Sequence, residues 1–209
     1  MSNFDMFDSD ESKYDSLEEL FDDMERMQGD PLAKAGTNVV ISRGNPKAKL
    51  LIVGEAPGPE ENIKRKPFVG NSGKLLDKIL QSAEFDPEKD VFITNSVFRM
   101  PPGEAGKPFR KPTLAEIEYY RPFVFAIIRL IDPLILLLTG NVACQSVLGM
   151  TGITNLRGKW TQLHNCWVMP IFHPSYLLRN PSQESGSPKA QMQADLRKVR
   201  RKYDELIRK

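Results

Sequence analysis

Cysteine is scarce in this chain, with two among 209 residues. Cys144 and Cys166 both lie in apolar segments, and their spacing is not that of a known metal motif. Free cysteine is among the most buried residue types in proteins. We therefore expect two buried thiols that hold no metal.

Long apolar runs are also absent. The longest, "PLILLLTG" from Pro133, has the length of a strand, whereas a membrane-spanning helix needs about 18 or more apolar residues. The N-terminus is acidic and lacks the basic and then apolar pattern of a secretory leader. We expect a cytoplasmic, intracellular monomer that works with the chromosome and has no membrane partner.

Basic residues are almost missing from the first thirty positions. This segment has eleven acidic side chains against Lys13 and Arg26, a net charge of −9. Because the formal charge of the chain is +2, the remaining residues must have a net charge of +11. A basic body of this kind favours a polyanionic partner such as nucleic acid.

Residues 1–36 are therefore predicted to form an acidic, disordered tail, although the pattern also allows a short helix around Leu17 to Met27. The tail is interpreted either as a solubilising extension that binds a protein partner, or as a segment that covers the basic surface and competes with DNA. Residues 37–209 are predicted to form the folded domain.

From Val39 onward, short apolar runs alternate with amphipathic patterns. The predicted strands are Leu50 to Val53, Val91 to Asn95, Leu134 to Leu138 and Trp167 to Phe172. The predicted helices are Ser72 to Ala83, Thr113 to Ile131, Asn141 to Leu148 and about Lys189 to Arg208. This alternation predicts an α/β fold, a three-layer αβα sandwich with a central four-stranded, mainly parallel sheet.

Polar residues follow three of these strands. The first strand runs into Gly54-Glu55-Ala56-Pro57-Gly58, the second ends at Asn95, and His173 follows the fourth. Because ligands bind at the carboxyl ends of parallel strands, we expect these residues to share one pocket. Asn95 could read a nucleobase edge, and His173 could donate to a group that gains negative charge. Each residue alone has an ordinary structural explanation, so only their shared location favours function.

Several ordered motifs resemble one family. The strings "VGEAPG", "KPFVGNSGKLLDKIL", "VFITN", "LRGKW" and "FHPSYLLRNPS" look like the uracil-DNA glycosylase superfamily, and most like its iron–sulfur branch, family 4, over about Val39 to Leu206. The resemblance implies a monofunctional hydrolase of N-glycosyl bonds that flips uracil out of DNA and leaves an abasic site for base excision repair.

The resemblance also implies roles for single residues. Glu55 and His173 would be catalytic, with Glu55 and Glu61 near the attacking water and His173 stabilising charge on the uracil. Phe68, which could equally be a core residue, would stack on uracil, and Asn95 would bind its polar edge. The implied substrate-binding residues are Gly54, Ala56, Gly58, Glu61, Phe68 and Asn95, and the implied DNA-binding residues are Ser72, Ser175, Tyr176, Leu177, Leu178 and Arg179.

The chain departs from family 4 where that branch holds a four-iron cluster on four cysteines. The matching places are "MQGD" (Met27 to Asp30), Arg99 and Tyr120, so we expect no iron–sulfur cluster and no metal. We expect packing of aromatic residues to hold this region instead. Ala56 stands where the fastest uracil-DNA glycosylases have an aspartate, which leaves the general base open among Glu55, Glu61 and Asn95.

Two other functions stay open. A non-catalytic nucleic-acid-binding or replication-accessory module could keep the same fold and pocket, and it would bind DNA with a strong salt dependence. A glycosylase for another altered base would keep the chemistry and change the target.

Overall fold

The computed structural model describes residues 13–103 and 106–208, and it contains one six-stranded sheet. The strands occur in the order β1-β3-β2-β4-β6-β5 across the sheet. Their bounds are Ser42–Gly44 (β1), Leu50–Gly54 (β2), Val91–Asn95 (β3), Ile135–Thr139 (β4), Thr161–Leu163 (β5) and Cys166–Ile171 (β6).

The four central strands, β3, β2, β4 and β6, are parallel, and they are the four that the sequence predicts. The number of strands was wrong, because β1 and β5 add an antiparallel strand at each edge. Each edge strand has three residues, "SRG" and "TQL", with too few apolar positions to produce an alternating pattern.

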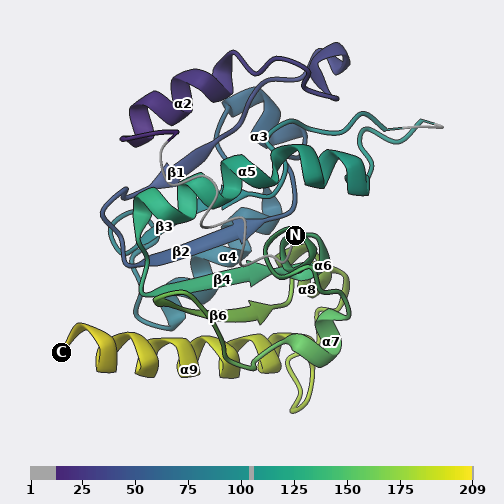
Figure 1. Ribbon diagram of the computed structural model, residues 1–209. Helices are drawn as coiled ribbons and strands as arrows, with labels where there is room; N and C mark the ends of the chain where they lie inside the picture. Colours follow the sequence, from purple (N-terminus) through teal and green to yellow (C-terminus); the bar gives the residue numbers. More distant parts are fainter. Residues whose placement is uncertain (1–12, 104–105, 209) are drawn as a thin grey trace.

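Helices cover both faces of the sheet, which confirms the predicted three-layer αβα sandwich. Leu51 and Val53 of β2 pack into one core, whereas Leu50 and Ile52 pack into the other, because successive strand residues point to opposite faces. The helices α5 and α4 lie on opposite sides of the sheet (Figure 1).

The helices are Leu17–Glu25 (α2), Pro59–Lys64 (α3), Asn71–Ser82 (α4), Leu114–Ile131 (α5), Gly140–Leu148 (α6), Ile153–Leu156 (α7), Pro174–Arg179 (α8) and Pro188–Ile207 (α9), with a 3₁₀ turn at Ala33–Ala35. Thr113 and Glu116 form the capping box that starts α5, and the helix continues through Pro122. Among the described residues, no helix is long and apolar enough to cross a membrane.

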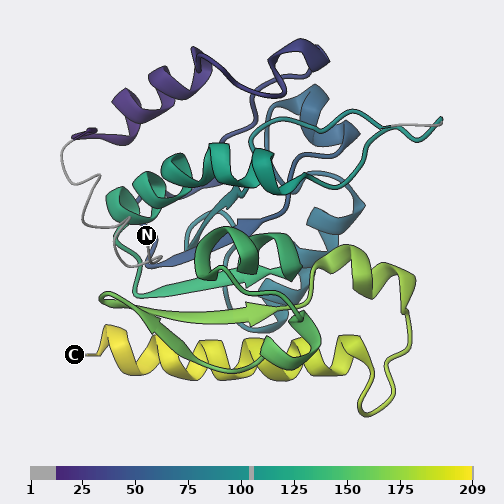
Figure 2. The ribbon, with the colours of Figure 1, turned by 45° about the vertical axis from the view of Figure 1, so that its right-hand side comes forward.

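The prediction of a disordered tail over residues 1–36 was wrong for residues 13–36, while residues 1–12 lie outside the described part. Helix α2 packs on α5 through the fully buried Leu20 and Met24 (Figure 1 and Figure 2). Arg129 of α5 also donates to the Tyr14 carbonyl at 2.6 Å. The high content of acidic residues favoured the prediction of disorder. The few apolar residues of α2 nevertheless lie on one face of the helix, and this is enough for it to pack.

A buried carboxylate anchors the end of this N-terminal segment. The side chain of Asp30 has no solvent exposure and accepts from Arg99 Nε at 2.6 Å and from the Tyr120 hydroxyl. Asp30 also accepts from the Leu32 amide at 2.9 Å, and Arg99 donates to the Thr37 carbonyl. Burial, with the Asp30 contact, raises the pKa of Tyr120 well above its usual value, so the hydroxyl remains a donor.

Asp30→Ala should destabilise the protein by about 3–5 kcal/mol, because it leaves the Arg99 guanidinium without its buried partner. Urea unfolding followed by circular dichroism measures this change. Asp22→Ala is the matched control, since Asp22 pairs with Arg26 on the surface, where such pairs contribute about 0–1 kcal/mol. Equal losses in the two variants would contradict the anchoring role of Asp30.

Candidate active site

A cavity of about 710 Å³ opens at the carboxyl ends of the central strands. The strand register puts these ends side by side, since Gly54 pairs with Asn95 and Thr139 pairs with Ile171. Of the residues singled out in the sequence, the cavity is lined by Glu55, Ala56, Gly58, Glu61, Phe68, Ser72, His173, Ser175, Tyr176 and Arg179.

Gly54 brings Asn95 next to Phe68. A Cβ atom on Gly54 would collide with the Asn95 Oδ1 atom and would lie 2.5 Å from Phe68 Cε2. The Asn95 amide and the Phe68 ring therefore both pack against the bare backbone of residue 54. Glycine is required here because any side chain would occupy the space of the amide or the ring.

His173 completes the group from the end of β6. Its ring centroid lies 5.8 Å from that of Phe68, with 32° between the ring planes. A Cβ atom on Gly140, at the start of α6, would lie 3.1 Å from His173 Cβ. Glu55, Phe68, Gly140 and His173, from four parts of the sequence, thus line one cavity, whereas Asn95 is not among the lining residues.

The hydrogen bonds of His173 define its tautomer. The Ser175 backbone N–H donates to His173 Nδ1 at 3.2 Å, and the Ser175 Oγ lies 2.8 Å from the same nitrogen. Burial, together with the charges of Arg179 and Lys111, lowers the pKa of His173 to about 4. The imidazole is therefore neutral at pH 7, and its proton is on Nε2 because Nδ1 accepts.

Glu55 is half-buried in the same cavity. Burial raises the pKa of its carboxyl above the usual 4.5, while the positive charges of Lys111 and Arg179 act against this shift. Among the described residues, the carboxylate has no ion-pair partner within salt-bridge distance. A carboxylate in such a site is available to orient a water molecule or to stabilise a developing cation.

Comparison with known proteins gives one family. The model of a protein family described as "Uracil DNA glycosylase superfamily" matches residues 41–197, which are most of the chain. The chain belongs to the uracil-DNA glycosylase superfamily. This result agrees with the resemblance seen in the strand-end motifs.

Two type-4 uracil-DNA glycosylases are similar to this chain over most of their length, and a DNA polymerase is similar over a small part. The type-4 uracil-DNA glycosylase of Thermotoga maritima is 38% identical over 159 residues, which cover 74% of this chain and 79% of the relative. The enzyme of that name from Saccharolobus solfataricus is 34% identical over 176 residues, 80% of this chain and 79% of the relative. A DNA polymerase of Bacillus phage SP01 is 34% identical over 155 residues, 74% of this chain but 16% of the polymerase.

Glu61 and Leu177 lie in environments that differ from the roles the resemblance implied for them, near the attacking water and at the DNA. Glu61 lines the cavity, but its Oε1 accepts from the Val69 and Gly70 amides at 2.9 and 2.7 Å. Leu177 is fully buried in the core and cannot face DNA, whereas Tyr176 and Leu178 on either side are exposed. The alternation reflects the helix α8, in which neighbouring residues point to different sides.

Sequence reasoning missed the segment before α5. Phe109 and Lys111 line the cavity, and Phe109 is 45% exposed. Arg110 holds this segment to α5 through two hydrogen bonds to the Glu116 carboxylate, at 2.8 and 2.6 Å. The capping box was the available signal, because it places the residues just before Thr113 at a defined helix start.

The residues of this chain do not fit the iron–sulfur cluster that the resemblance implies. Asp30, Arg99 and Tyr120 stand at the places that the resemblance matches to cluster cysteines, and Asp30 accepts from both Arg99 and Tyr120. Cys144 and Cys166 are both buried, and these two thiols are fewer than the four thiolates that hold such a cluster. Within residues 13–103 and 106–208, no group of metal-binding side chains occurs.

A titration followed by NMR tests the electrostatics of the cavity. We expect the pKa of Glu55 to lie above 4.5 and to rise further in Lys111→Met, because a nearby positive charge is removed. Lys47→Met is the control, since Lys47 is exposed in the turn before β2, at the other end of that strand. A Glu55 pKa below 4.5, or one unchanged in Lys111→Met, would contradict this description.

Proposed function

We propose that this protein hydrolyses the N-glycosidic bond of deoxyuridine in DNA and leaves an abasic site. The observation that supports this proposal best is the grouping of the Phe68 ring, the Asn95 amide and the His173 ring beside Gly54. An aromatic face, an amide with one donor and one acceptor edge, and a neutral N–H donor are the groups that a uracil ring requires.

His173 stabilises the leaving base in this proposal. As the bond between the sugar and uracil N1 breaks, its electron pair moves into the ring and negative charge collects on O2. The neutral imidazole donates its Nε2–H to this oxygen, while Ser175 keeps Nδ1 occupied. A preorganised donor of this kind in a site that excludes water contributes more than the same hydrogen bond in bulk water.

Glu55 serves the other side of the reaction. The sugar gains positive charge as the base departs, and a nearby carboxylate stabilises this charge and orients the water that attacks C1′. The Glu55 carboxyl must be ionised for this role. Since its pKa is raised, the reaction should slow on the acid side as pH falls through that raised value. Glu61, by contrast, is occupied by two backbone amides.

Helix α8 and the cavity rim contact DNA in this proposal. Tyr176 and Leu178 are exposed apolar side chains beside the cavity, suited to enter the minor groove and fill the space of the extruded nucleotide. Arg179 and Lys111 lie at the rim, where each can neutralise a phosphate. Leu177, buried beneath them, supports the helix and does not touch the duplex.

We further propose that the protein works without an iron–sulfur cluster. The Asp30, Arg99 and Tyr120 side chains join the same three segments that the cluster cysteines of the implied family would join. This bonding replaces the expected packing by aromatic residues as the main link, although Phe98 and Tyr120 also pack edge to face.

A second candidate is a replication-accessory module that binds DNA without releasing a base. The similarity to part of a phage SP01 DNA polymerase favours it, because that sequence is carried within a replication protein. The two functions share the fold and the pocket. They differ in whether uracil leaves the DNA.

Incubation with an oligonucleotide that carries one deoxyuridine, followed by alkali, tests the proposed reaction. We expect strand breakage at the uracil position, and a rate about 10²–10³-fold lower in His173→Ala, because one donor to the leaving base is lost. Tyr203→Phe, in α9 on the opposite side of the core, is the control for general effects on the fold. No cleavage above the His173→Ala level, together with salt-dependent DNA binding, would favour the accessory module instead.

Iron analysis tests the second part of the proposal. Protein expressed with added iron should contain far less than one four-iron cluster per chain, and its uracil release should survive treatment with a chelator and an oxidant. Four iron atoms per chain, or loss of activity together with loss of iron, would overturn the proposal.

A further inference from the structure

Phe68 has a backbone conformation that its own side chain disfavours. Its φ angle is +53°, in the left-handed region that residues other than glycine rarely adopt. Such a conformation persists only where the surroundings determine it. The groups that hold this turn therefore decide where the Phe68 ring lies in the cavity.

Two charged side chains hold the turn. Glu61 accepts from the amides of Val69 and Gly70, just after Phe68. Arg43 donates from Nε to the Pro67 carbonyl at 3.0 Å, just before it. The turn is thus bonded on both sides of the residue with positive φ.

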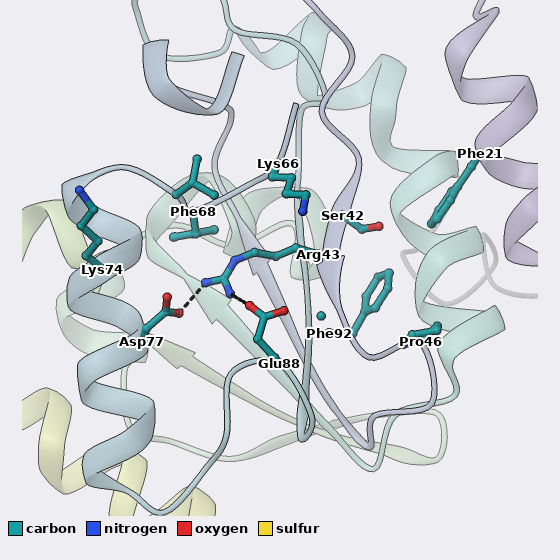
Figure 3. Close-up of a pocket in the computed structure, with 12 residues that line it drawn as sticks. Phe21, Ser42, Arg43, Pro46, Lys66, Phe68, Lys74, Asp77, Glu88 and Phe92 are labelled. Carbon is teal, nitrogen blue, oxygen red and sulfur yellow. Dashed lines mark hydrogen bonds and ion pairs between the residues drawn. The ribbon is translucent and has the colours of Figure 1, made fainter. Parts of the chain in front are cut away.

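Arg43 is itself held in place. Its side chain is 7% exposed, with one NH₂ group bonded to Asp77 of α4 at 2.5 Å and the other to Glu88 at 3.0 Å. Figure 3 shows the guanidinium directed between these carboxylates, with Phe68 nearby. All three nitrogen atoms of the guanidinium are used, so the group has one defined position.

Phe68 is buried in the core, and its residue lines two cavities. On one side is the candidate active site, with Glu55 and His173. On the other is a second cavity of about 680 Å³, lined by Arg43, Lys66 and Lys74 among others. The ring packs against Gly54 and the Phe68 backbone packs against Gly73, while the hydrogen bonds from Arg43 and to Glu61 hold the turn on both sides.

We propose that Arg43 is a positioning residue for base recognition. It keeps the Phe68 turn in its left-handed conformation, so that the ring is already placed to stack on a flipped uracil. Asp77 and Glu88 act through Arg43 by keeping its guanidinium oriented. This proposal rests on the proposed function, because it names the residue that prepares its stacking surface.

Inhibition by free uracil measures this role directly. In Arg43→Met the inhibition constant should rise about tenfold, a part of what base stacking contributes. Arg43→Lys should restore only some of the affinity, leaving a rise of about threefold, since a single ammonium cannot bond to a carbonyl and two carboxylates at fixed angles. In the Phe68→Ala background, Arg43→Met should cause no further change.

Arg200→Met is the matched control for loss of stability. Arg200 also joins a carboxylate, Asp204, and a carbonyl, that of Glu84, but it lies on α9 and does not line the active-site cavity. The Arg200→Met substitution should lower the unfolding temperature without changing the inhibition constant of free uracil. Inhibition within twofold of wild type in Arg43→Met, or effects that multiply in the double variant, would overturn the proposal.

Hydrogen exchange separates this proposal from the proposed function. The amides of Val69 and Gly70 should exchange about tenfold faster in Arg43→Met, while those of β4 keep their rates. This readout needs no catalysis. If the wild type releases no uracil, the proposed function fails, whereas unchanged exchange at Val69 and Gly70 means that Arg43 does not hold the turn.

Discussion

The parallel register of β3, β2, β4 and β6 is the constraint on which the site depends. The hydrogen bonds between these strands bring their carboxyl ends to the same edge of the sheet, where Gly54 lies opposite Asn95. The strands are apolar along most of their length, and polar side chains such as Thr94, Asn95 and Thr139 occur only at their carboxyl ends. The cavity lies where neighbouring strands end and their side chains change from apolar to polar.

The electrostatics of the cavity follow from the burial of its two titratable groups, Glu55 and His173. Burial keeps His173 neutral and raises the pKa of Glu55, so the two groups have the forms that the proposed chemistry needs near neutral pH. Because the pKa of Glu55 is higher in the folded than in the unfolded chain, the folded state binds more protons there. Its carboxylate therefore lowers stability as pH rises through that range. A functional site commonly carries such a cost.

A single buried carboxylate links the N-terminal segment to the rest of the domain. Asp30 bonds to Arg99 after β3 and to Tyr120 in α5, which links three distant segments through one buried carboxylate. Such an anchor requires every lone pair and donor to be matched, since a buried charge without partners is costly. It fastens the segment that follows the acidic helix α2 to the rest of the chain, which has a net charge of opposite sign.

The sequence by itself determined the four parallel strands, the helices that alternate with them and the strand-end residues Glu55, Asn95 and His173, because strand periodicity and breakers are local signals. It did not reveal the edge strands β1 and β5, the burial of Leu177 or the cavity role of Lys111, since short polar segments carry no periodic pattern. Only the tertiary structure decided that Glu61 and Arg43 serve the Phe68 turn and that Asp30 meets Arg99 and Tyr120. These contacts join residues whose partners lie up to 90 positions away, and hydrogen bonds at that separation depend on how the layers pack.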